Sequence, residues 1–114
     1  MSAAFIPQGL LIRYLDSLPE KKQALDTLFE SFLRNVNEDA ARDLRSAMHR
    51  LAGSTAMYGL DGLSNTIRAA LRVVDSALEN GSLPNSELLG QARLQIDQSW
   101  SVAAQEARQS IAEG

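Results

Sequence analysis

The residues from Asn37 to Gly59, NEDAARDLRSAMHRLAGSTAMYG, have the pattern of one complete helix with both of its ends. Asn37 is a favourable N-cap residue, and the two acidic residues after it suit the positive end of the helix dipole. Gly59 suits the position just beyond the C-terminus, because glycine adopts the left-handed backbone conformation without strain. We therefore expect a helix from about Glu38 to Tyr58.

Four other segments also have apolar residues at the spacing of an amphipathic helix. A short one runs from Gln8 to Leu18, and we expect Pro19 to begin a separate helix, since a first turn tolerates proline. The stripes of the other three span residues 25–36, 63–78 and 88–111. Short breaks between long helices make neighbours antiparallel. The sequence thus predicts an all-α, up-down-up-down antiparallel four-helix bundle with a short additional N-terminal helix.

Composition narrows the possible functions of this single domain, residues 1–114. The chain has one His, no Cys and a net charge of −3. The lack of cysteine excludes disulfides, a thiol nucleophile and thiolate zinc sites, and one histidine excludes any site that needs two imidazoles from one chain. The charge gives no sign of nucleic-acid binding, and no apolar run approaches the roughly 20 residues of a membrane-spanning helix. We expect a cytoplasmic monomer.

The helix from Glu38 to Tyr58 breaks its own pattern at its histidine. A projection at about 100° per residue puts His49 nearly opposite the core face, near Arg42 and Arg45. Gly53, four residues later, would leave the imidazole open to another protein. A mid-helix glycine lowers stability by roughly 0.5–1 kcal/mol relative to alanine, and this access is a reason to keep it despite that cost. The core face of the projection comprises Ala40, Leu44, Ala47, Leu51, Thr55 and Tyr58. The small side chains of Ala52 and Ala56 are expected to extend the open surface.

The segment from His49 to Gly59, HRLAGSTAMYG, resembles the phosphoacceptor segment of histidine phosphotransfer (HPt) domains. Members of that family typically have His-x-Leu-Lys-Gly, then two small residues, a Gly ten residues after the His and a Leu four further on. The residues that match in register are Leu51, Gly53, Ser54, Thr55, Gly59 and Leu63. The resemblance extends to the whole helical layout, including the hairpin that turns at Gly59.

Two positions depart from the family pattern. Ala52 stands where members usually have a Lys that helps to hold the phosphoryl charge. Leu71 stands across the hairpin where members often have a Glu or Gln that orients the ring. Arg68 and Arg72 lie nearby on the same helix as Leu71, so they are candidates to approach the site.

The resemblance implies a phosphorelay intermediate of two-component signalling. His49 would accept a phosphoryl group from a phospho-aspartate on a receiver domain and pass it to another receiver, with a sensor or hybrid histidine kinase upstream. The receiver would supply the aspartate and the Mg²⁺, so the resemblance implies that this chain itself needs no metal site and no cofactor. No ATP-binding motif is present in the sequence, so we expect a phosphoryl carrier without kinase activity of its own.

Three arginines are the predicted docking residues for the phosphoryl group and the acidic receiver surface: Arg45, Arg42 and Arg50. The alternative for these arginines is ordinary solvation and pairing with nearby acids such as Glu38. Met48 and Met57 flank the histidine face, either as adaptable docking surface or as the edge of the core.

Three other functions remain as alternatives. The first is a non-catalytic HPt-like bundle that binds a receiver or kinase without being phosphorylated, which Ala52 and Leu71 favour. The second is an unrelated enzyme with His49 as a base, although no orienting carboxylate stands at a recognisable spacing. The third is a structural or dimerisation bundle.

Overall fold

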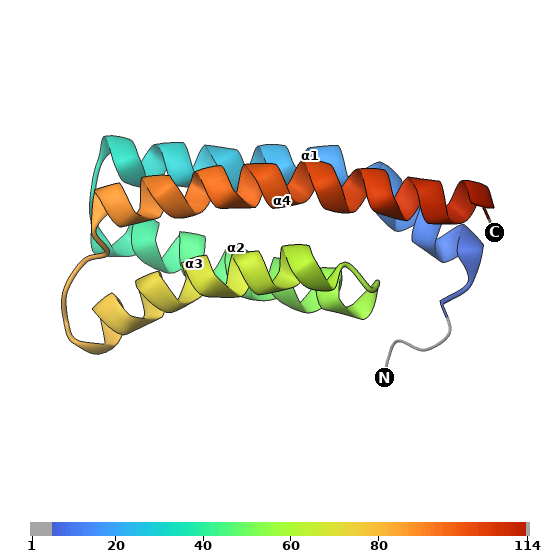
Figure 1. Ribbon diagram of the computed structural model, residues 1–114. Helices are drawn as coiled ribbons and strands as arrows, with labels where there is room; N and C mark the ends of the chain where they lie inside the picture. Colours follow the sequence, from blue (N-terminus) through green and yellow to red (C-terminus); the bar gives the residue numbers. More distant parts are fainter. Residues whose placement is uncertain (1–5, 114) are drawn as a thin grey trace.

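The computed structural model describes residues 6–113, which form four α-helices: α1 (Gln8–Arg34), α2 (Glu38–Met57), α3 (Asp61–Glu79) and α4 (Ser86–Glu113). Successive helices are antiparallel, and each packs against two neighbours, so that α1 and α3 both contact α2 and α4 (Figure 1). The described residues contain no strand. The predicted all-α four-helix bundle is confirmed. No helix in this range is both long and apolar enough to span a membrane.

The prediction of a separate short N-terminal helix is wrong, because α1 runs unbroken from Gln8 to Arg34 with Pro19 inside it. Proline inside a helix lacks one backbone N–H donor, which normally costs about 3 kcal/mol. Burial on both sides of the proline outweighs this cost. Leu15 and Leu18 before it and Leu25 after it are all in one core, and their spacing keeps them on the same face of a continuous helix.

Side chains from all four helices fill the core between them. In α3 the predicted apolar stripe is confirmed, since Leu63, Ile67 and Val74 are completely buried. In α4 the expected single long helix is also confirmed, but Leu88 points outward and is 51% exposed. The helix starts at Ser86 because Asn85 accepts a hydrogen bond from the Leu88 N–H at 3.0 Å. The largest fully buried side chains include Phe29, Phe32, Leu44, Met48, Ile67 and Ile96.

The hairpin between α2 and α3 is closed by Gly59, as its position in the sequence predicts. Its φ of +81° is a left-handed conformation that favours glycine. The Gly59 N–H donates to the Ala56 carbonyl at 3.0 Å, and the Leu60 N–H donates to the Thr55 carbonyl at 2.8 Å. This pair of bonds is the Schellman motif, which satisfies the last carbonyls of α2 and reverses the chain.

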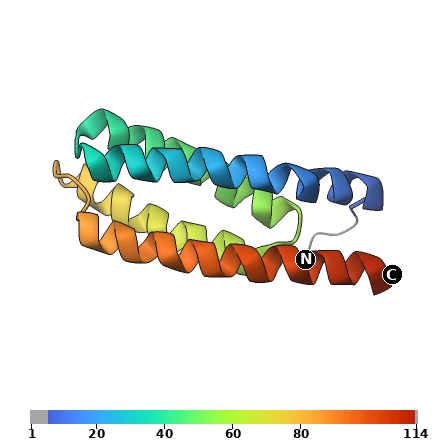
Figure 2. The ribbon, with the colours of Figure 1, turned by 90° about the horizontal axis from the view of Figure 1, so that it is seen from above.

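Helices α1 and α4 are longer than the two helices of the α2–α3 hairpin. Helices α1 and α4 have 27 and 28 residues, whereas α2 and α3 have 20 and 19. At about 1.5 Å per residue, α1 and α4 therefore extend past the α2–α3 turn, as Figure 2 shows from above. The Tyr14 ring of α1 stacks on the Tyr58 ring at 4.1 Å, and its hydroxyl bonds Ser54 Oγ at 2.7 Å. Burial raises the pKa of Tyr14 despite that hydrogen bond.

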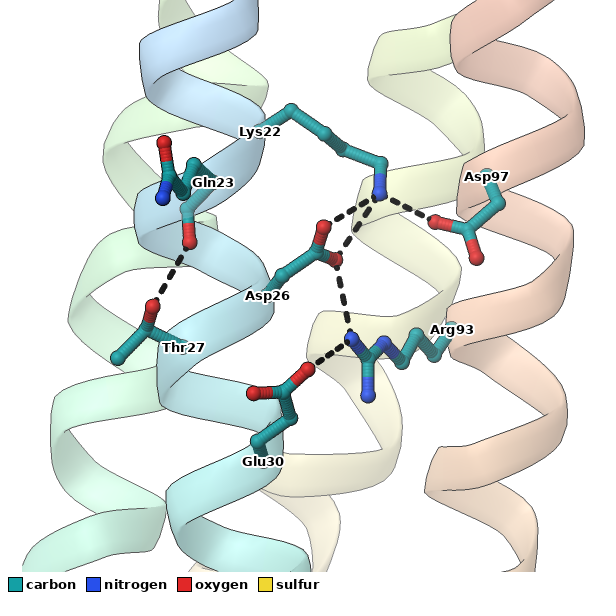
Figure 3. A network of polar contacts seen from close by, with 7 residues as sticks. All are labelled: Lys22, Gln23, Asp26, Thr27, Glu30, Arg93 and Asp97. Atoms are coloured by element: carbon teal, nitrogen blue, oxygen red, sulfur yellow. Dashed lines mark hydrogen bonds and ion pairs between the residues drawn. The ribbon is translucent and has the colours of Figure 1, made fainter.

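The contact between α1 and α4 contains a network of ion pairs (Figure 3). Lys22 of α1 reaches Asp97 of α4 at 2.6 Å and Asp26 at 2.8 Å. Arg93 of α4 reaches Glu30 of α1 at 3.0 Å and Asp26 at 3.4 Å. Burial alone would lower the pKa of Lys22, but its hydrogen bonds to the two aspartates outweigh that effect and raise it. This network lies on the α1–α4 side of the bundle and leaves the α2–α3 side free for a functional site.

Candidate functional site

The single histidine of the chain lies near the middle of α2 and is exposed, as predicted. The N-terminus of this helix is fixed by Asn37, whose side chain accepts a hydrogen bond from the Ala40 N–H at 2.8 Å. Within residues 6–113 the imidazole of His49 takes part in no hydrogen bond or ion pair. The ring is therefore held only by its place on a regular helix, with its nitrogens open to a partner.

The core face of α2 is rotated toward α3 relative to the predicted one. Leu44, Leu51 and Thr55 are buried as expected, but the prediction that Ala52 extends the open surface is wrong. Ala52 is completely buried, and its carbonyl accepts a hydrogen bond from Ser64 Oγ of α3 at 2.8 Å. The reason is tertiary: α2 packs closely on α3, and this contact covers a strip that the helix projection alone leaves outside the core.

The same rotation moves the remaining residues of the predicted core face to its margin and gives the two methionines different surroundings. Ala40, Ala47 and Tyr58 are only partly buried at the margin of the core. Met48 is completely buried, whereas Met57 is 67% exposed, so only the latter offers an accessible thioether. Since Met48 and Ala52 enclose one flank of His49, the histidine lies on the α3 side of the exposed surface and not directly opposite the core.

Gly53 is exposed on the open flank of His49. A Cβ atom added at this position would meet no other atom of the protein within 4 Å. No packing contact within residues 6–113 therefore demands a glycine here, and the backbone is ordinary helix, without a positive φ. Ala56, one turn further on, is half-buried. The bare helix surface beside the imidazole comes from Gly53 and in part from Ala56.

The three predicted docking arginines lie in different surroundings. Arg42 pairs with Glu38, its Nη2 lying 2.6 Å from Oε2, so the alternative of local acid pairing holds for this residue. Arg45 Nε lies 3.8 Å from Asp75 Oδ1 on α3, a pairing that the sequence did not indicate. Arg50 is exposed and points to the other side of α2, where it borders a groove against α1.

The groove between α1 and α2 brings Arg50 together with Lys21, a residue that the sequence analysis did not single out. Its floor includes Leu25, Ala47 and Leu51. Lys21 lies on a different helix, far away in the sequence, and only the α1–α2 packing shows that the two cations share a rim. The Lys21 ammonium also lies 5.7 Å from the centre of the Tyr14 ring.

Across the hairpin, Leu71 is 7% exposed and belongs to the core, so it offers no polar atom to orient the imidazole. Arg68 and Arg72 on the same helix are exposed. Among residues 6–113 no group of three or more His, Asp or Glu side chains is arranged to hold a metal ion. The chemistry that this surface offers is an accessible imidazole nucleophile on a helix that also carries Arg42, Arg45 and Arg50.

Comparison with known families bears directly on this arrangement. The family model described as Hpt domain matches residues 9–109, nearly the whole chain. The matched range contains the four-helix core, the exposed histidine and the glycine turn of the hairpin. No match was found among the curated proteins or the solved structures. With a family match over this much of its length, the chain belongs to the Hpt domain family.

Proposed function

We propose that His49 carries one phosphoryl group between receiver domains, which makes this chain a phosphorelay intermediate. Membership of the Hpt domain family gives it a role in two-component phosphorelays. The observation that supports the finer proposal is the single exposed histidine in the middle of α2, with Gly53 leaving its flank bare. An approaching receiver needs both the free ring nitrogen and the space beside it.

In the forward step, the lone pair of the unprotonated ring nitrogen, by our expectation Nε2 of His49, attacks phosphorus in line. The N–P bond forms as the P–O bond to the receiver aspartate breaks, and the aspartate leaves as a carboxylate with the bonding electrons. The proton on the other ring nitrogen stays there or passes to water. Transfer to a second receiver is the reverse reaction. Such transfers depend mainly on positioning and charge stabilisation, and we expect the receiver to provide Mg²⁺.

We place receiver docking over His49 and across the exposed surface of α2 to the groove between α1 and α2. Lys21 and Arg50 at the rim would attract an acidic receiver surface, while the half-buried Ala47 offers a small apolar contact. Complementary charge accelerates encounter and fixes the orientation of the partner. Arg42 is a weaker candidate for docking because Glu38 already neutralises it.

The proposal is tested by mixing the chain with radiolabelled phosphorylated receivers and Mg²⁺, then adding a second, unlabelled receiver. We expect label to appear on the chain and then to leave it for the second receiver. Arg50→Gln should raise the chain concentration needed for half-maximal transfer, because it removes one docking cation. Arg13→Gln, on the exposed surface of α1, is the matched control.

The second candidate is a non-catalytic module that binds a receiver without accepting phosphate. Two observations favour it: Leu71 provides no polar group to orient the ring, and the buried Ala52 provides no charge. Stable binding of a phosphorylated receiver, with no label on the chain at any time, would support this candidate and contradict the relay proposal.

A further inference from the structure

The face of α2 that carries His49 borders α3, and two contacts fix how the helices align. Ser64 Oγ of α3 donates to the Ala52 carbonyl at 2.8 Å, and Arg45 of α2 lies 3.8 Å from Asp75 of α3. His49 lies between Arg45 and Ala52 along α2. At about 100° per residue it is only about 40° around the axis from Arg45, the side chain that reaches α3.

Two arginines of α3 lie between the same two contacts. Arg68 and Arg72 are both exposed and fall between Ser64 and Asp75 in the sequence of α3. Around the helix axis, Arg68 is about 40° from Ser64 and about 20° from Asp75, the two residues that contact α2. Arg72 is one turn further along and about 40° closer to solvent. Because the helices are antiparallel, the segment with Arg68 and Arg72 runs alongside the segment with His49.

The charges of these two arginines are not neutralised by the described part of the chain. Arg42 is paired with Glu38 and Arg45 with Asp75, whereas neither Arg68 nor Arg72 forms an ion pair within residues 6–113. A phosphoryl group on His49 would add about two negative charges. Guanidinium groups suit such a group, since their planar N–H donors match phosphate oxygens.

We propose that Arg68 and Arg72 hold the phosphoryl group on His49 from across the hairpin. They would supply the charge that the Lys typical of the family supplies from position 52, which in this chain is a completely buried alanine. This proposal rests on the proposed function, because it concerns the phosphorylated state of His49. The positive charge that Ala52 lacks is thus supplied by arginines of α3 and not by those of α2.

The test uses phosphoramidate, which phosphorylates accessible imidazoles without a receiver. The ring nitrogen attacks phosphorus, the P–N bond of the reagent breaks, and ammonia leaves with the imidazole proton. Since His49 is the only histidine, the modification has one position. Thermal unfolding is then measured for phosphorylated and unphosphorylated forms of the wild type and of the R68Q/R72Q variant. The R13Q/R34Q variant is the matched control, because it loses the same charge from exposed positions on α1.

We expect phosphorylation to lower the Tm of R68Q/R72Q by about 3–5 °C more than that of the wild type or the control, an electrostatic effect of surface charges. The excess should shrink in 1 M salt, where the screening length falls to about 3 Å. Equal Tm changes in all three proteins would overturn the proposal, and so would an equal excess in the control. Failure of receivers to label the wild-type chain would instead overturn the proposed function, whatever the Tm values show.

Discussion

A single glycine provides the sharpest test of the access argument. Replacing Gly53 by alanine adds one methyl group at a place where nothing lies within 4 Å. Alanine favours a helix interior over glycine by about 0.5–1 kcal/mol, mainly by reducing the backbone entropy lost on folding. Because no clash offsets this gain, we expect Gly53→Ala to raise the free energy of unfolding by that amount. For a domain of this size, the gain corresponds to a Tm increase of roughly 2–5 °C.

The same substitution should impair function, because the added methyl stands on the open flank of His49. We expect Gly53→Ala to slow phosphoryl transfer from a phosphorylated receiver and Gly53→Glu to block it, with the circular dichroism spectrum of both variants unchanged. The assay is single-turnover transfer of label at several receiver concentrations, alongside thermal unfolding. If replacing Gly53 makes the protein more stable but slows phosphoryl transfer, the glycine is kept for access to His49.

Gly90 provides the matched control for Gly53. It also lies inside a helix, and a Cβ atom there would again meet nothing within 4 Å. Gly90→Ala should therefore bring a similar stability gain and leave transfer unchanged. Transfer by Gly53→Glu at the wild-type rate would refute the access reasoning, and a loss of stability in Gly53→Ala would refute the view that the surface beside His49 is open.

Three further predictions concern stability. Gly59→Ala should lower the free energy of unfolding by about 1–2 kcal/mol in denaturant titrations, because φ is +81° there, and Gly59→Asn should cost less. Pro19→Ala should raise it by about 1–2 kcal/mol, since the new N–H can donate to the Leu15 carbonyl, and an unchanged midpoint would contradict the account of α1. Burial raises the pKa of Tyr14 above its ordinary value of 10.0. The stabilising contribution of its protonated hydroxyl is therefore complete below pH 10.0 and is lost as pH rises through the folded-state pKa. The wild type should thus lose more stability between pH 9 and 11 than Tyr14→Phe, and parallel curves would contradict this.

Local signals in the sequence were enough to predict the ends of α2 and the place of His49. Asn37 and Gly59 act through hydrogen bonds within a few residues, so their identity alone indicates the N-cap and the hairpin turn. The exposure of His49 and Gly53 follows from helix periodicity, which is also a local property.

The features that the sequence did not predict all depend on packing between helices. Pro19 looks like a helix start because the burial of Leu15 and Leu18 in the shared core is a tertiary effect. Ala52 is buried because α3 packs against its side of α2, and no pattern within α2 reveals that side. The pairing of Arg45 with Asp75 likewise depends on the antiparallel alignment of two helices.

The central claim is that the phosphoryl group is carried by His49. It is tested most directly by incubating wild type and His49→Gln with the same radiolabelled phospho-receiver and Mg²⁺. Because His49 is exposed, the glutamine variant should leave the core undisturbed, and its circular dichroism spectrum provides the check. The account predicts label on the wild type and none on the folded variant. Label on the His49→Gln chain would contradict it.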